Sequence, residues 1–256
     1  MNKLKIFFSI LIVGLLFSCS DSDEDSSPTI TVNYKAVYGN NPLVLNEDVW
    51  FFNDETMTFS KLNLFISDLT LKGQNGDQLL SDVEFVTFET SNRTEDGAAE
   101  GMSQTFDAEV GDYNGISFGI GVSPVLNSLP PSEYDSDHVL GQFGAYWAAW
   151  NSFIFSKTEG MIDSDGDDEP DLAFVYHAGA DKMYRVKTVN TDISVLDGEE
   201  VEIDVIIDYK RVFGEMDDHI DILNNPTFHS PQDTALAELT QQLPENFLSA
   251  ITVEVQ

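Results

Sequence analysis

Short stretches of alternating apolar and polar residues recur along most of this chain, and they restrict its fold more than any other feature. Glycine, asparagine, aspartate or proline bounds each stretch, and alternation is the pattern of a strand with one buried face. Many short strands of this kind predict an all-β sandwich or barrel, and we expect a β-sandwich of antiparallel strands. The expected strands are Thr29–Tyr38, Lys61–Lys72, Val83–Glu89, Gln104–Val110, Gly115–Gly121, Phe174–His177, Met183–Val189 and Val201–Tyr209.

Two segments have helical spacing instead. The first is Asp137–Ala149. The second is Thr234–Phe247, where leucines recur at helix spacing behind Asp233 as an N-cap. We therefore expect one or two short helices beside the strands.

The start of the chain has the composition of an export signal. A basic start is followed by an apolar run that is shorter than the roughly 20 residues needed to span a bilayer. Residues 1–18 are therefore expected to be a signal peptide. Leu16 and Ser18 precede Cys19, and this sequence resembles the bacterial lipobox, in which the cysteine receives the lipid. The alternative is an ordinary signal peptide followed by a buried free cysteine.

An acidic segment separates the signal from the body of the chain. Residues 20–27 are serines and acids only, so residues 19–28 are expected to form a lipidated, flexible tether. The segment also resembles the acidic export signal of Bacteroidetes surface lipoproteins. Residues 29–256 have the length of one domain. We expect an outer-membrane lipoprotein, held to the membrane through Cys19 and facing either the periplasm or the cell surface.

The charge and the missing motifs limit the function further. The chain has a net charge of −33, which repels nucleic acid and anionic headgroups. It either attracts cations or a basic partner or simply keeps the protein soluble. Cys19 is the only cysteine, which leaves the body without disulfides or thiolate metal sites. No nucleophile elbow, phosphate loop or HExxH helix is found, so we expect a binding protein rather than an enzyme.

A run of acids in the second half of the chain has the spacing of a calcium loop. The sequence DSDGDDEPD at residues 163–171 resembles the calcium loops of thrombospondin type 3 repeats. In a curled loop, alternate aspartates can direct their oxygens at one calcium ion. The expected ligands are Asp163, Asp165, Asp167 and Asp171. The alternative is an acidic turn between two strands.

An ordered set of motifs covers nearly the whole body. It comprises FSKLNLFISDLTLKGQNG at residues 59–76, YNGISFGIGV at 113–122, YWAAWNSFIFSKTEG at 146–160, YHAG at 176–179, and His229-Ser230. From about Thr29 to Val255 the chain resembles the MbnP-like family, including its Bacteroidetes lipoprotein members.

That resemblance implies a periplasmic β-sandwich that binds copper and is encoded beside a di-haem enzyme of the MauG and cytochrome c peroxidase type. In related copper proteins a tryptophan is oxidised to kynurenine, whose amine joins histidines around Cu(I). Without thiolates, copper requires imidazole or thioether ligands. The candidates are His177 and His229, with Trp147 or Trp150 as the modified residue.

Other interpretations of these residues stay open. The copper-binding relatives tend to have Trp-x-Trp, whereas two residues separate Trp147 from Trp150. Core packing is the favoured interpretation of both tryptophans, because aromatic side chains bury a large area. His138 and His219 lie among acids and are expected at the surface. The alternative function is a surface interaction or adhesion module of the same fold, without copper and with a structural calcium loop.

Overall fold

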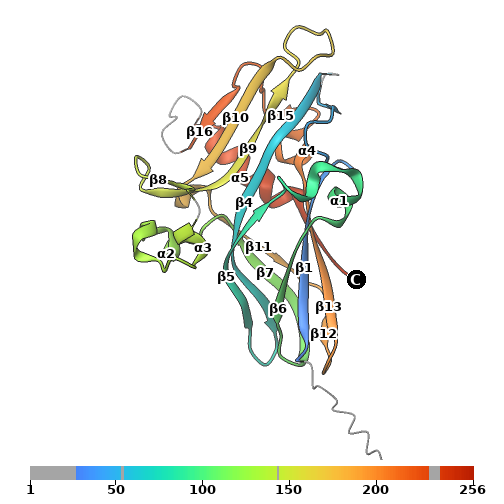
Figure 1. Ribbon diagram of the computed structural model, residues 1–256, viewed down its shortest axis with the longest axis vertical. Coiled ribbons are helices and arrows are strands. Elements are labelled where there is room, and N and C mark those ends of the chain that lie inside the picture. Colours follow the sequence, from blue (N-terminus) through green and yellow to red (C-terminus); the bar gives the residue numbers. More distant parts are fainter. Residues whose placement is uncertain (1–26, 53–54, 143, 231–236) are drawn as a thin grey trace, which may run out of the picture.

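Strands dominate the computed structural model, which describes residues 27–52, 55–142, 144–230 and 237–256. The expected all-β sandwich is confirmed (Figure 1). The expected signal peptide, residues 1–18, and the expected lipidation site Cys19 lie outside the described residues. The strands are β1 (Thr29–Tyr38), β2 (Asn41–Pro42), β3 (Val49–Trp50), β4 (Thr56–Gly73), β5 (Gln78–Thr87), β6 (Met102–Asp107), β7 (Gly111–Ile120), β8 (Tyr146–Trp147), β9 (Ser152–Ile162), β10 (Leu172–Gly179), β11 (Arg185–Val189), β12 (Ile193–Val195), β13 (Glu200–Asp208), β14 (Gly214–Glu215), β15 (Asp218–His219), β16 (Thr227–His229) and β17 (Ile251–Val255).

Short helices connect these strands. The α-helices are α1 (Glu95–Glu100), α2 (Pro124–Asn127), α3 (Val139–Gln142), α4 (Tyr209–Val212) and α5 (Leu239–Ala250), and the 3-10 turns are η2 (Ser91–Arg93), η3 (Pro131–Glu133) and η4 (Asp181–Met183). None of the helices in the described part of the chain is long and apolar enough to cross a membrane.

Two large sheets contain most of the strands in the described part of the chain, and β14 and β15 form a separate two-stranded sheet. Of the two large sheets, the smaller has the order β17-β13-β1-β2, with β6 also paired to β1. The larger has the order β11-β7-β4-β9-β10-β16, with β3 and β5 also paired to β4, β12 to β7 and β8 to β9. Long β4 runs through much of the molecule and joins its two ends (Figure 1): β9 pairs with its first half and β7 with its second half.

Two strand pairs are parallel, in contrast to the expected antiparallel arrangement. They are β1 with β13 and β10 with β16. Parallel neighbours need a long crossover, and alternation within a strand does not specify which distant strand will lie beside it. The second parallel pair builds the candidate site described below.

The helical expectations were partly wrong. Only Val139–Gln142 is helical within the expected Asp137–Ala149, and the chain then turns into β8. Two glycines in this segment weaken a helix. In the expected Thr234–Phe247, the described helix is Leu239–Ala250, while residues 231–236 lie outside the described part.

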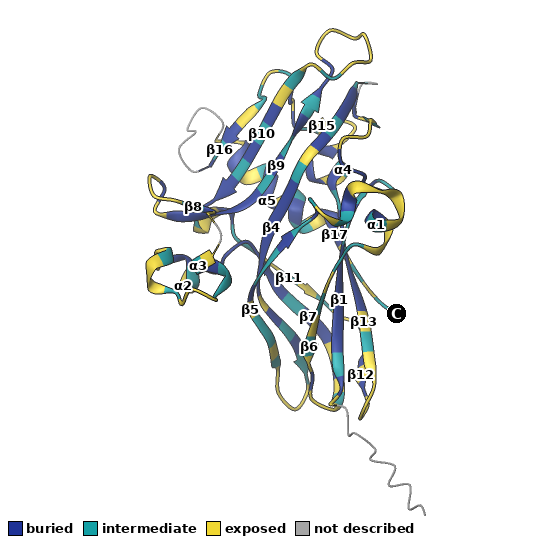
Figure 2. Ribbon diagram, in the orientation of Figure 1, coloured by how far each residue is buried: buried dark blue, intermediate teal, exposed yellow. Residues whose placement is uncertain are grey.

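Aromatic side chains fill the space between the sheets. The ring of Phe59 on β4 lies 5.8 Å from Phe174 on β10, 6.0 Å from Tyr209 on α4 and 6.1 Å from Phe213, measured between centroids. All four side chains are buried, and buried positions follow the strands in Figure 2. Burial of large rings on this scale is the main source of stability in such a core.

Candidate metal centre

The parallel pairing of β10 and β16 brings two histidines together. In this register His177 lies directly opposite His229, so both side chains leave the same face of the sheet. Their ring centroids are 5.1 Å apart. Two of the four histidines of the chain are therefore neighbours, although they are far apart in sequence. The sequence could name these histidines but not the register that joins them.

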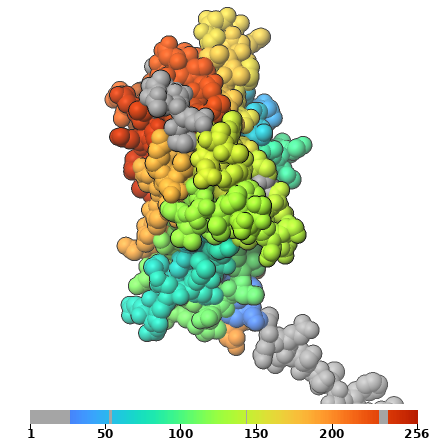
Figure 3. Space-filling model, turned by 90° about the vertical axis from the view of Figure 1, so that its left-hand side faces the viewer, coloured from blue at the N-terminus to red at the C-terminus, as the bar shows by residue number. Residues whose placement is uncertain are grey.

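The two expected tryptophans lie over the same histidine. Trp147 and Trp150 stack with centroids 4.9 Å apart and planes 10° from parallel. Their centroids are 5.6 and 6.3 Å from that of His229. Trp147 is 37% exposed and Trp150 only 8%. Figure 3 faces this side of the molecule, where the yellow-green segment around β8 lies beside orange segments that follow it in sequence. All four expected copper-site residues thus form one cluster.

A backbone cradle holds the inner tryptophan. A Cβ placed on Gly179 would lie 3.2 Å from Cε3 of Trp150 and 2.6 Å from the carbonyl oxygen of Phe153, so only glycine allows this approach. Asn127 supports the same corner, since its amide oxygen accepts from the backbone N–H of Phe153 at 2.9 Å. The loop that carries Trp150 is therefore held by specific contacts at its base.

The nitrogens of His177 have different surroundings. Nε2 is 2.8 Å from Oε1 of Glu159, whereas Nδ1 is buried and has no hydrogen-bond partner among the described residues. Burial is the largest cause that lowers the pKa of His177, and His229 and Lys157 lower it further against the opposing effect of Glu159. The ring is therefore neutral at pH 7, and a neutral imidazole has a lone pair available for a metal.

A second unsatisfied nitrogen lies in the same cluster. Nε1 of Trp150 is buried without a partner among the described residues. A buried polar atom without a partner is costly, and native proteins rarely contain one. Two of the five buried side-chain atoms without a partner among the described residues therefore lie around His229.

The other two histidines lie elsewhere. The ring of His138 stacks on Tyr134 at 4.6 Å, and its Nε2 is 3.3 Å from Oδ2 of Asp82. The ring of His219 stacks on Phe52 at 4.8 Å. Both side chains are partly exposed and take no part in the His177–His229 cluster.

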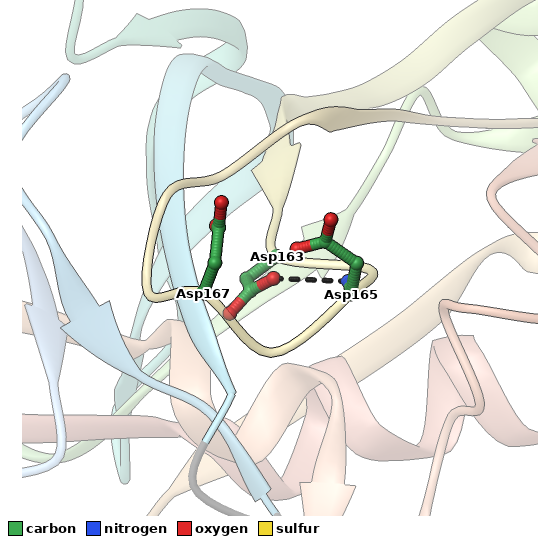
Figure 4. Close-up of side chains that lie close together, drawn as sticks. All are labelled: Asp163, Asp165 and Asp167. Atoms are coloured by element: carbon green, nitrogen blue, oxygen red, sulfur yellow. Dashed lines mark hydrogen bonds between the residues drawn. The ribbon is translucent and has the colours of Figure 1, made fainter.

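The acidic loop connects β9 to β10, and three of its expected ligands lie together. Donor atoms of Asp163, Asp165 and Asp167 are within 4.8 Å of one another (Figure 4). The buried carboxylate of Asp163 also accepts three backbone N–H groups, which lower its pKa. The charge of Asp167 raises the pKa of Asp165. The loop therefore has both the backbone order of an acidic turn and a concentration of negative charge.

Asp171, the fourth expected ligand, makes its hydrogen bonds at the base of the loop. Its carboxylate accepts from the backbone N–H of Ser164 at 2.9 Å and from the hydroxyl of Ser164 at 3.1 Å. It closes the base of the loop, and it is not one of the three clustered side chains. Calcium binding in this loop stays a prediction.

Sequence reasoning missed Glu159 as part of the histidine cluster. It lies diagonally across from His177, because β9 pairs Lys157 with His177 and Glu159 with Val175. The one available signal was the alternation in Ser-Lys-Thr-Glu, which places Lys157 and Glu159 on one strand face. Only the register shows which strand that face lies beside.

The comparisons with known proteins agree with this architecture. The family model described as MbnP matches residues 27–230. Among solved structures, MbnP from Methylosinus trichosporium is similar with a TM-score of 0.51 and 10% identity, over 89% of this chain and 98% of that chain. At this identity the likeness shows the fold alone. No curated protein sequence matches significantly. Since the family model spans most of the body and the fold agrees with it, the chain belongs to the MbnP family.

Proposed function

We propose that the protein is a copper-binding lipoprotein of the outer membrane, with its metal at the His177–His229 cluster. The observation that carries the proposal is the buried Nδ1 of His177, which lacks a partner among the described residues and lies on a ring beside His229. We infer a binding role and not catalysis.

The side chains at the cluster fit copper by their chemistry. Two neutral imidazoles suit copper, and divalent copper binds nitrogen ligands more tightly than zinc does. In the described part of the chain, the only group of three metal-binding side chains with close donor atoms is the acidic loop. Among the described residues the histidine pair thus belongs to no group of three such donors, and the nearby carboxylate of Glu159 contacts the Nε2 side of His177. Two imidazoles alone favour Cu(I), since that ion tolerates few ligands. Bound copper would supply a coordination partner for imidazole nitrogen in this corner.

We further propose that one of the stacked tryptophans becomes kynurenine and contributes a third donor. Trp150 has the buried, unpartnered indole nitrogen, while Trp147 is the more exposed ring of the stack. A di-haem enzyme resembling cytochrome c peroxidase would catalyse this oxidation with peroxide or dioxygen as the oxidant, and the lost carbon would leave as formate. Conversion adds about 4 Da to the chain, because one carbon is lost and one oxygen is gained.

Titration of the stripped protein with Cu(I) tests the copper proposal. Protein from its native host, freed of metal and titrated against a coloured Cu(I) chelator, is expected to remove one equivalent of Cu(I) per chain from the chelator. Zn²⁺ at the same concentration should compete weakly. Failure to withdraw Cu(I) would exclude this function and favour an interaction module of the same fold.

Loss of the lipid anchor gives an independent prediction about location. Cys19→Ala is expected to release the protein from membranes into the soluble envelope fraction. Without the acyl chains attached at Cys19, the protein has no anchor that binds the bilayer stably. Fractionation and immunoblotting measure the result, with Cys19 retained as the control. If the variant stays with the membrane after a high-salt wash, the anchor is not at Cys19.

Calcium is expected to stabilise the acidic loop. A ligand that binds only the folded state raises its stability by about 2.7 kcal/mol at a hundredfold excess over the Kd, and extracellular calcium sites have Kd values on the order of 10⁻⁴–10⁻³ M. Thermal melting in millimolar calcium should therefore exceed melting in chelator. The double variant Asp165→Asn, Asp167→Asn is expected to lose that difference. An equal calcium response in the variant would contradict the loop as the site.

A further inference from the structure

The contact between His177 and Glu159 determines which nitrogen of the ring carries the proton. A carboxylate oxygen accepts hydrogen bonds, so the 2.8 Å contact with Oε1 requires the hydrogen on Nε2. A neutral imidazole carries only one N–H, and its lone pair is then on Nδ1. This is the nitrogen that is buried without a partner among the described residues.

Glu159 is itself held in place from the other side. Lys61 lies opposite Glu159 in the pairing of β4 with β9, and its Nζ is 3.8 Å from Oε2. One oxygen therefore faces His177 while the other faces a cation. The side chain of Glu159 is 25% exposed and that of His177 is 13% exposed, so solvent only partly competes for this contact.

The lysine on the neighbouring strand cannot replace this carboxylate. Lys157 lies directly opposite His177, but an ammonium donates hydrogen bonds and cannot accept the N–H of an imidazole. His229, on the opposite neighbour strand β16, stands beside the ring at 5.1 Å between centroids. The three strands thus place an acceptor on one side of His177 and a second imidazole on the other.

We propose that Glu159 is a positioning residue that fixes the Nε2-protonated form of His177 and thereby presents Nδ1 for metal binding. This inference rests on the proposed copper site. Histidine ligands of metals commonly donate their other N–H to a carboxylate, which orients the ring and makes the coordinating nitrogen more basic.

Nitrogen NMR of the metal-free protein tests the inference without any copper. Long-range ¹H–¹⁵N spectra report the protonated nitrogen of each histidine. In the wild-type protein His177 is expected to be wholly in the Nε2–H form, whereas Glu159→Ala should give a mixture of both forms or a reoriented ring. Glu159→Gln should restore the Nε2–H form in part, because its amide oxygen can still accept. An identical His177 signal in all three proteins would overturn the proposal.

Copper affinity provides the second measurement. Glu159→Gln is expected to weaken Cu(I) binding by about 10- to 100-fold. The matched control is Glu89→Gln, which removes the same charge from an acid that hydrogen-bonds Asn63 and does not contact His177. Its affinity should equal that of the wild type. Equal losses in both variants would mean that net charge acts and not positioning. If the wild type binds no copper, the copper proposal fails, and the NMR comparison alone decides the role of Glu159.

Discussion

His177→Ala is expected to abolish tight copper binding, with a loss of affinity larger than the about 10- to 100-fold that removal of an outer hydrogen-bond partner costs. The substitution removes the buried Nδ1 that lacks a partner and leaves His229 as a single imidazole. His229→Ala should have the same effect, because the two rings face one site. Competition with a Cu(I) chelator measures both variants.

The matched control for this experiment is His138→Ala. That side chain is also partly buried and contacts a carboxylate, Asp82, but it stands apart from the cluster. Its copper affinity is expected to equal that of the wild type. Circular dichroism shows whether each variant is folded. Should folded His177→Ala and His229→Ala keep wild-type affinity, the metal would have to lie elsewhere.

Gly160→Ala is expected to destabilise the fold more than a glycine-to-alanine substitution at any other glycine of the described strands. A Cβ at this position would be only 1.9 Å from the carbonyl oxygen of Thr58 and 2.6 Å from Cζ of Phe174. The backbone of β4 at Thr58 and the buried ring of Phe174 on β10 cannot both move away without a large loss of stability. Overpacking of a core costs about 1–3 kcal/mol, and a clash with backbone lies at or above the upper end.

Gly111→Ala is the control for that variant. The nearest atoms to its added Cβ are in the ring of Tyr113 at 3.7–3.8 Å, an ordinary contact distance. Urea unfolding is expected to show a lower midpoint for Gly160→Ala and almost no change for Gly111→Ala. Equal midpoints would mean that the close approach of β4 and β9 at Gly160 is not as described.

The alternation of apolar residues predicted the strands that have one buried face. β1 lies at the expected Thr29–Tyr38 because its core side chains follow every second position for most of its length. The first half of β9 is buried on both faces and has no alternation, so no strand was expected there. The sequence pattern could not predict which strands lie side by side, since a pairing such as that of β10 with β16 depends on the whole fold.

The candidate site was predictable in its residues but not in its geometry. His177, His229 and the two tryptophans were named because the resemblance to the MbnP-like family implies imidazole and kynurenine nitrogens around copper, and a chain without body thiols permits such a site. Glu159 was not, because an acid among 45 in the chain is distinguished only by its neighbours on adjacent strands. Asp171 stays a predicted calcium ligand, and its carboxylate accepts from the backbone and the hydroxyl of Ser164.

Copper binding and tryptophan oxidation are tested together by the metal content and the intact mass of the protein from its native host. We expect one copper per chain and a mass about 4 Da above that of the lipidated chain with unmodified tryptophans. Peptide mapping should place the increase on Trp147 or Trp150. Protein made in a host without the di-haem enzyme is the control and should lack the increase. Native protein with neither copper nor the added mass would contradict copper binding at the His177–His229 cluster and the oxidation of a tryptophan there.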